Sequence, residues 1–274
     1  MKFFRPRGRN DRVRTARSPL TQATALYRAG RYAAAEAEAR AVARSRVPDD
    51  PYASLALGFV AMAIGAQGRH GDAVAAYDAL LPDFGRLFGA EHPQTLKLRS
   101  DRAQQLTALG RHAECEAECA AVARTAARGT GPEMHLIAAA AANGLVFAVN
   151  AQGRHAEAEA LAREALTAYG EQDLLALVLR LGLARGLNGQ GRHGEALAEA
   201  EGADELRRHV PEDEYRPQGG AVDLVMATAL FGLGRSSEAR SRATAAHDAC
   251  LAAVGPDHRR TVEARTLLDR IDGA

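Results

Sequence analysis

Small and apolar residues recur along the chain at helical spacing, in stretches separated by short polar turns that contain glycine. Near-copies of one turn, Gln-Gly-Arg-His-Ala-Glu-Ala around Gly153, mark six places in the sequence. The glycines of these copies are Gly30, Gly68, Gly110, Gly153, Gly191 and Gly234, separated by 38, 42, 43, 38 and 43 residues. Self-similarity at such a period predicts a stack of helical hairpins. Since no strand-like run intervenes, we predict an all-α chain.

Each position of the repeated turn has a residue type suited to a junction between two helices. Glycine suits the residue after a helix, where the backbone turns left-handed. Arginine follows in all six copies and lies beside the negative end of the first helix. An acid such as Glu157 comes four positions after the glycine in five copies, near the positive end of the second helix. The next residue is small, as at Ala158, which predicts close contact between the two helices.

The repeated turn resembles that of tetratricopeptide repeats, in which Gly-x-Tyr-x-x-Ala joins helix A to helix B. Tyr32 keeps the aromatic residue of that family, and His70, His112, His155 and His193 replace it. The segments 89 to 96 and 255 to 262 resemble the linker of the longer, kinesin-light-chain-type repeats found in many bacterial proteins. The resemblance implies a right-handed superhelical α-solenoid of six hairpins with a C-terminal capping helix. It also implies that His92 and His258 stabilise the linker turns.

The helical pattern sets the expected bounds of each hairpin. We predict helix pairs at 18 to 29 and 32 to 46, 52 to 67 and 71 to 88, 93 to 109 and 113 to 128, 133 to 151 and 156 to 169, 174 to 188 and 194 to 209, and 218 to 233 and 237 to 254. Residues 211 to 217 are predicted to be a charged linker, and a single capping helix is expected at 259 to 271. The first hairpin is expected to begin at Ser18, as N-cap, and Pro19.

Charge divides the chain into two parts. Residues 1–17 carry seven cationic side chains against Asp11, a balance of +6, whereas the whole chain has a net charge of +1. We expect residues 1–17 to be a basic, disordered arm and residues 18–274 to be one solenoid domain. The arm is also the only part of the chain with a charge suited to nucleic acid.

Composition favours a cytoplasmic protein. The three cysteines have no spacing typical of a disulfide framework, which indicates a reducing compartment. The N-terminal residues lack the apolar core of a signal peptide, and we expect no membrane-spanning segment.

The sequence contains none of the common enzyme signatures, such as a phosphate-binding glycine loop or a His-Glu-x-x-His pair. His112, Cys115 and Cys119 share a helix face at a spacing that could offer three zinc ligands. Because the two cysteines fall at core positions, we interpret them as small packing residues instead. We therefore expect no catalytic residue, no metal and no cofactor.

One face of the helix A series has no evident structural purpose. Positions spaced i, i+4 and i+7 line up on a helix, and the resemblance places this face along the concave groove. Near the centre of the chain the face carries polar side chains, and the candidate binding residues are Gln104, Asn143, Phe147, Asn150, Arg185 and Asn188. Asn143 matches an asparagine that contacts the backbone of bound peptides in kinesin-light-chain-type repeats. Plain solvent exposure of this face is the alternative.

These observations favour a non-enzymatic scaffold that binds a peptide or a partner-protein segment in the concave groove. The alternative is a ligand-responsive regulator, in which a small peptide or metabolite in the same groove changes the curvature of the superhelix. We expect a monomer or a weak homodimer, with no membrane partner and with nucleic acid reached only through the arm.

Overall fold

The computed structural model describes residues 19–47, 50–169, 173–215, 218–256 and 258–273, which form helices and connecting turns without any strand. The helices are α1 (Thr21–Arg28), α2 (Tyr32–Arg44), α3 (Pro51–Ala66), α4 (His70–Leu87), α5 (Pro93–Ala108), α6 (His112–Arg128), α7 (Pro132–Ala151), α8 (His155–Tyr169), α9 (Asp173–Gly189), α10 (His193–Arg207), α11 (Glu212–Tyr215), α12 (Ala221–Gly232), α13 (Ser236–Val254) and α14 (Arg259–Asp272).

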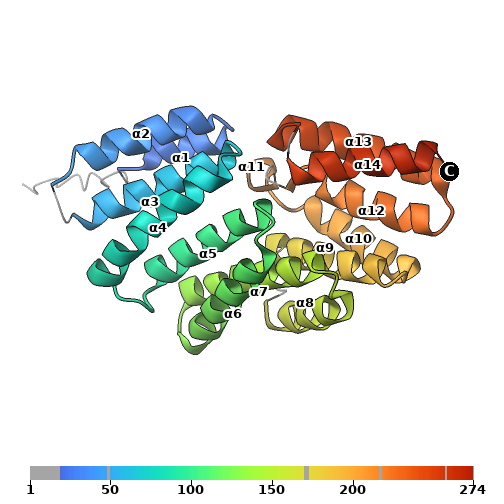
Figure 1. Ribbon diagram of the computed structural model, residues 1–274, viewed down its shortest axis with the longest axis horizontal. Helices are drawn as coiled ribbons and strands as arrows, with labels where there is room; N and C mark the ends of the chain where they lie inside the picture. Colours follow the sequence, from blue (N-terminus) through green and yellow to red (C-terminus); the bar gives the residue numbers. More distant parts are fainter. Residues whose placement is uncertain (1–18, 48–49, 170–172, 216–217, 257, 274) are drawn as a thin grey trace, which may run out of the picture.

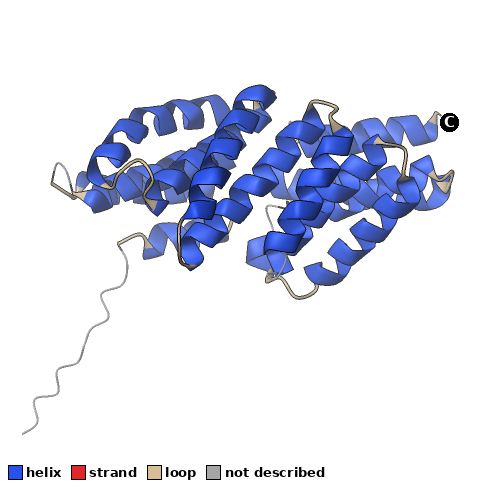
Figure 2. Ribbon diagram, turned by 90° about the horizontal axis from the view of Figure 1, so that it is seen from below, coloured by secondary structure: helices blue, strands red, loops and turns tan. Residues whose placement is uncertain are grey.

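Consecutive helices pack on each other and form six hairpins, from α1–α2 to α12–α13, and α14 packs on the last of them. Figure 1 shows the hairpins side by side along a curved path, so that α1 and α2 lie at one end and α13 and α14 at the other. Figure 2 shows the same stack from below. The predicted α-solenoid of six hairpins with a C-terminal helix is confirmed.

Helix ends lie within three residues of the sequence prediction, and two differences concern the start of the first hairpin and the predicted linker. Helix α1 begins at Thr21, and Leu20 precedes it without a side-chain cap; the predicted cap, Ser18, lies outside the described residues, as does the whole predicted arm. The segment predicted to be a linker contains the short helix α11. A helix of four residues is too short to be recognised from a periodic pattern of apolar residues.

The six turn glycines adopt the left-handed backbone that the pattern predicts, with φ between +72° and +80°. The small residues that follow them are all fully buried: Ala35, Ala73, Cys115, Ala158, Ala196 and Ala239. A larger side chain at these positions would push the two helices of a hairpin apart. The repeat register derived from the sequence is therefore confirmed.

Three of the arginines that follow the turn glycines also bridge two hairpins. Arg192 bonds Glu195 in its own hairpin and also Glu159 in the preceding one, at 2.6 Å in each case. Gln190, just before the glycine, donates to the same Glu159 carboxylate at 2.8 Å. The same arrangement recurs twice, at Arg154, Gln152 and Glu116 and at Arg69, Gln67 and Glu36. These bonds join neighbouring hairpins along the outer edge of the turns.

The two linker histidines act as helix caps, as the resemblance implied. Nδ1 of His92 accepts the backbone N–H of Gln94, and Nδ1 of His258 accepts that of Arg260, both at 3.2 Å. In the second linker, the hydroxyl of Thr261 also donates to the carbonyl of Gly255 at 2.7 Å. Each linker therefore satisfies backbone groups at a helix start that would otherwise lack partners.

By length and composition alone, α7 could cross a membrane, which the sequence prediction did not anticipate. It is the one described helix with this property, and half of its most apolar window is buried inside the protein. Its neighbours α5, α6, α8 and α9 pack around it. A helix with this much apolar surface fits the core of a solenoid, where both neighbouring hairpins cover it.

Candidate functional site

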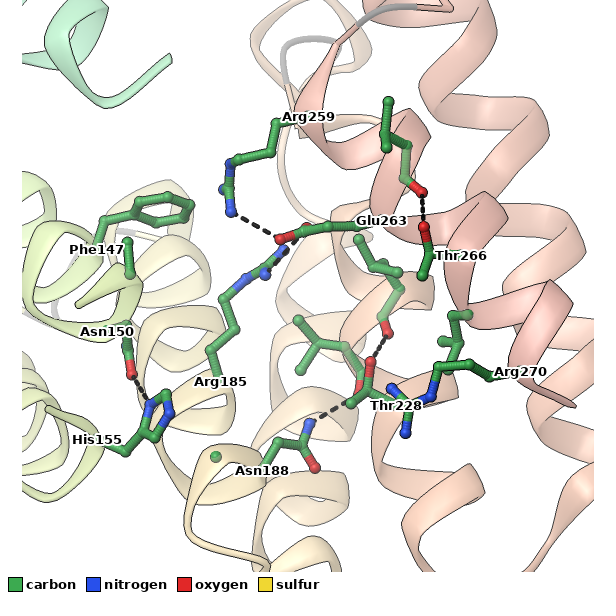
Figure 3. Close-up of a pocket in the computed structure, with 16 residues that line it drawn as sticks. Phe147, Asn150, His155, Arg185, Asn188, Thr228, Arg259, Glu263, Thr266 and Arg270 are labelled. Carbon is green, nitrogen blue, oxygen red and sulfur yellow. Dashed lines mark hydrogen bonds and ion pairs between the residues drawn. The ribbon is translucent and has the colours of Figure 1, made fainter. Parts of the chain in front are cut away.

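A cavity of about 610 Å³ lies between α7, α9, α12 and α14. Helices α7, α9 and α12 are the first helices of three successive hairpins, and α14 lies across from α7 and α9 (Figure 3). The polar side chains that line the cavity are Asn150, His155, Arg185, Asn188, Thr228, Arg259, Glu263, Thr266 and Arg270, and the larger apolar ones are Phe147, Leu224, Val225, Val262 and Leu267.

Four of the six binding residues predicted from the sequence line this cavity: Phe147, Asn150, Arg185 and Asn188. The structure does not bring the other two to it. Asn143 lies one turn before Phe147 on α7 and is half-buried, and Gln104 is exposed on α5, two helices away along the stack. The predicted face therefore contributes to the cavity only where α14 covers it.

The two cavity amides are engaged in bonds between and within hairpins. Nδ2 of Asn150 donates to the carbonyl of Gly182 on α9 at 2.9 Å, and its Oδ1 lies 3.3 Å from Nδ1 of His155. Asn188 repeats this pattern with the carbonyl of Val225 and with His193, at 3.2 and 3.1 Å. Each amide group therefore uses one of its two N–H donors in these bonds. Their role in ligand binding stays a prediction, alongside an evident structural role.

A charged cluster joins three helices across the cavity. The Glu263 carboxylate accepts Nη1 of Arg259 at 2.7 Å through one oxygen and Nη1 of Arg185 at 3.4 Å through the other. Both guanidinium groups also lie over the Phe147 ring, at 4.6 Å for Arg259 and 5.6 Å for Arg185. Figure 3 shows Glu263 pointing between the two arginines. Phe147, one of the predicted binding residues, is therefore a cation–π partner of two arginines.

The sequence prediction missed the contribution of α14. It gave the segment 259 to 271 only the role of a capping helix and named no binding residue on it. In the structure the helix presents a stripe to the cavity, consisting of Arg259, Val262, Glu263, Thr266, Leu267 and Arg270. Their spacing of i, i+3, i+4, i+7, i+8 and i+11 follows one helix face, so the pattern was present in the sequence. Nothing in the sequence indicated that this face meets α7 and α9.

Positive charge exceeds negative charge in the cavity. Three arginines line it, and Glu263 is the one acidic residue among the described lining residues, which leaves a balance of about +2. Burial lowers the pKa of Arg259, and the Glu263 carboxylate opposes that shift. Burial, followed by the charges of Arg260 and Arg259, lowers the pKa of His258 to about 4, so that this neighbour is neutral near pH 7. The site is therefore suited to an anionic group.

The cluster considered for zinc does not form a ligand set. Cys115 and Cys119 are buried with their sulfur atoms 3.8 Å apart, and the Thr107 hydroxyl donates to Cys115 at 3.1 Å. Within the described residues, no group of three or more histidine, cysteine or acidic side chains is placed to hold a metal ion.

Comparison with known proteins identifies the repeats. Residues 97–121, 139–164 and 177–201 match the family model described as tetratricopeptide repeat. A search of curated protein sequences finds no match.

Solved structures with the same fold include the nearly identical TPR-like repeats of a kinesin light chain from Podosopora anserina, with a TM-score of 0.56 and 21% identity over 70% of this chain and 94% of that one. Another is PlcR of Bacillus thuringiensis in complex with the peptide PapR7 and DNA, with a TM-score of 0.57 and 14% identity over 81% of this chain and 74% of that one. At these identities the likeness concerns the fold.

Proposed function

Since the chain is an α-solenoid of tetratricopeptide repeats, we propose that it is a non-enzymatic scaffold that binds a peptide or partner-protein segment in the cavity between α7, α9, α12 and α14. Fold alone does not assign a function, so the proposal depends on the site. The observation that carries it is the Arg185–Glu263–Arg259 cluster, which adjoins apolar side chains inside a cavity of about 610 Å³.

The chemistry of the cavity fits peptide recognition. Leu224, Val225 and Leu267 offer apolar contact, while the arginine side chains present forked N–H groups that match carboxylate and carbonyl oxygens. Cavities of roughly 300 to 1,000 Å³ with apolar walls and a few polar groups are typical binding sites. This combination of apolar walls and forked N–H donors supports binding as the function of the site.

A ligand-responsive regulator is the second candidate, and one observation favours it. The cluster links α7 and α9 to α14. Its two outermost residues, Phe147 and Glu263, are 116 positions apart in the sequence. A ligand that separated these side chains would change how α14 sits against the two earlier hairpins. PlcR, which shares the fold, is in complex with a peptide in its solved structure.

The test of the scaffold proposal compares two arginines on the same helix. Arg185 pairs with Glu263 inside the cavity, whereas Arg180 pairs with Glu199 at 2.5 Å outside it. The main protein that co-purifies with the full chain, or a peptide from it, is titrated against wild type, Arg185→Ala and Arg180→Ala. Loss of a charge-assisted hydrogen bond should weaken binding by about 1.5 to 3 kcal/mol, tenfold or more, in Arg185→Ala only.

Equal affinities for wild type and Arg185→Ala, at matched thermal stability, would contradict the proposed site. Small-angle scattering on the same samples separates the two candidates. A scaffold keeps its radius of gyration when the peptide binds, whereas a regulator of the kind described changes it.

A further inference from the structure

The geometry points to Glu263 as an internal occupant of a carboxylate site, and we infer that the ligand of this cavity is a short carboxylate-bearing molecule, such as a peptide end, that displaces Glu263. This inference rests on the proposed function, because it names the ligand class of the same cavity. It adds that the site is closed by the protein itself when no ligand is present.

The two oxygens of Glu263 are divided between two guanidinium groups from different helices. Arg259 on α14 holds one oxygen at 2.7 Å, and Arg185 on α9 holds the other at 3.4 Å. Both guanidinium groups lie over the Phe147 ring in cation–π contact. Two arginines positioned by a third side chain around one carboxylate form a preorganised carboxylate site. The site exists whether the carboxylate comes from Glu263 or from a ligand.

Glu263 does not use the full capacity of the site. Each guanidinium has five N–H donors, and Glu263 accepts one N–H from each arginine within hydrogen-bond distance. Arg270, the third arginine of the cavity, lies over the Phe231 ring and has no acidic partner within 4 Å among the described residues. The balance of about +2 favours a ligand with more negative charge than the single carboxylate it replaces.

The cavity also limits the size and character of the ligand. A volume of about 610 Å³ suits a drug-sized molecule or a few residues of peptide rather than a long extended segment. Val262 lies next to Glu263 on the cavity side of α14 and is 46% exposed. An apolar group beside the carboxylate of the ligand would cover Val262.

Glu263 can leave its position without being buried elsewhere. Its side chain is 35% exposed, so rotation away from the arginines would place the carboxylate in water at small cost. Because the paired side chains keep 20 to 35% of their surface exposed, water screens part of the attraction between them. A ligand carboxylate therefore competes with an internal group that water already reaches.

The experiment measures carboxylate rescue in Glu263→Gln, which removes the charge and keeps the size of the side chain. Thermal unfolding of the full chain is followed in increasing sodium propionate, with sodium chloride at equal ionic strength as the reference. Propionate supplies one carboxylate and a short apolar group. Glu263→Gln should show a saturable, propionate-specific rise in Tm. The propionate concentration that gives half of this rise should be about tenfold lower than the concentration that gives half of any rise in wild type.

The matched control is Glu199→Gln, which frees Arg180 of its acidic partner outside the cavity. It should show no propionate-specific rise, because a single arginine on an open surface binds carboxylate weakly. Adding Arg259→Gln to Glu263→Gln should abolish the rise. A Tm of Glu263→Gln that responds to propionate no more than wild type, or than Glu199→Gln, overturns the inference.

The two proposals fail in different ways. If Arg185→Ala loses partner binding while Glu263→Gln gains no propionate response, the cavity binds a partner through groups other than a carboxylate. If propionate stabilises Glu263→Gln while Arg185→Ala keeps full partner affinity, the carboxylate site exists but is not where the partner binds.

Discussion

Asparagine side chains on the inner face of the repeats differ in whether they bond other parts of the protein. Asn150 and Asn188 each bond a backbone carbonyl of the next hairpin and the histidine that follows the turn. Two of the four histidines that replace tyrosine in the repeated turn, His155 and His193, are therefore held by these amides. In the third hairpin Thr107 takes the position of Asn150 and bonds Cys115 instead, and Nδ1 of His112 is buried without a partner among the described residues.

Replacing Asn150 by alanine should therefore destabilise the protein. The substitution removes the bond from Asn150 to the Gly182 carbonyl and leaves Nδ1 of the His155 ring without this partner, which costs about 1 to 3 kcal/mol. Asn143→Ala is the matched control on the same helix, because its half-buried amide is bonded to no other described side chain, and it should stay within about 0.5 kcal/mol of wild type. Urea unfolding gives both values. Equal losses in the two variants would show that the Asn150 bonds add nothing to stability.

At the scale of helices, the segments between hairpins determine where the first helix of the next hairpin, or the final helix, begins. Where the linker ends in histidine, at His92 and His258, the imidazole caps the next helix through a ring nitrogen that must be free of a proton. Burial and the neighbouring arginines keep His258 neutral by lowering its pKa to about 4. The start of α14, and with it the position of Arg259 at the cavity, therefore depends on the protonation of one side chain.

The cap predicts a pH dependence with a defined sign. The pKa of His258 falls from an ordinary value of about 6.5 in the unfolded chain to about 4 in the folded protein, so the unfolded chain binds more protons between these values. Stability from this group is present above about pH 6.5 and is lost as pH falls toward 4. Because the ring is partly exposed to solvent, we expect a loss on the order of 1 kcal/mol.

His258→Asn isolates this effect, since asparagine caps a helix at any pH. The free energy of unfolding of both proteins is measured at pH 7 and pH 4.5. Wild type should lose more of it at the lower pH than the variant does. His209→Asn, at an exposed position beyond α10, is the control and should track wild type at both values. A pH-independent difference between wild type and His258→Asn would contradict a pH-dependent cap at the start of α14.

At the scale of the whole molecule, each hairpin contacts its neighbours, and the curvature of the stack brings distant helices together. The Arg–Gln–Glu bonds at three junctions fasten successive turns, and the accumulated rotation brings α14 opposite α7 and α9. This closure creates the cavity. A repeat protein is held mainly by nearest-neighbour contacts, so a segment that lies before the first hairpin in the sequence should be dispensable for folding.

Deleting residues 2–17 is the corresponding test. The segment precedes the first hairpin and carries a charge of +6 in the sequence, and we expect its removal to leave the Tm of the solenoid unchanged. Any affinity for nucleic acid should disappear with it and should weaken steeply with salt in the full chain. A large fall in Tm on deletion would show that the segment packs against the repeats.

The sequence by itself determined the number of hairpins, the left-handed glycine turns and the buried small-residue column, because each depends on residues close together in the chain and is repeated six times. It also indicated which helix face carries Phe147, Asn150, Arg185 and Asn188. The tertiary structure alone decided that the Asn150 and Asn188 amides hold the next hairpin, and that Arg259 and Glu263 of α14 complete a cavity with Arg185, 78 residues from Glu263. The physical reason is that local pattern fixes each hairpin and its contact with the next, whereas the closure of α14 onto α7 depends on small rotations summed over several repeats.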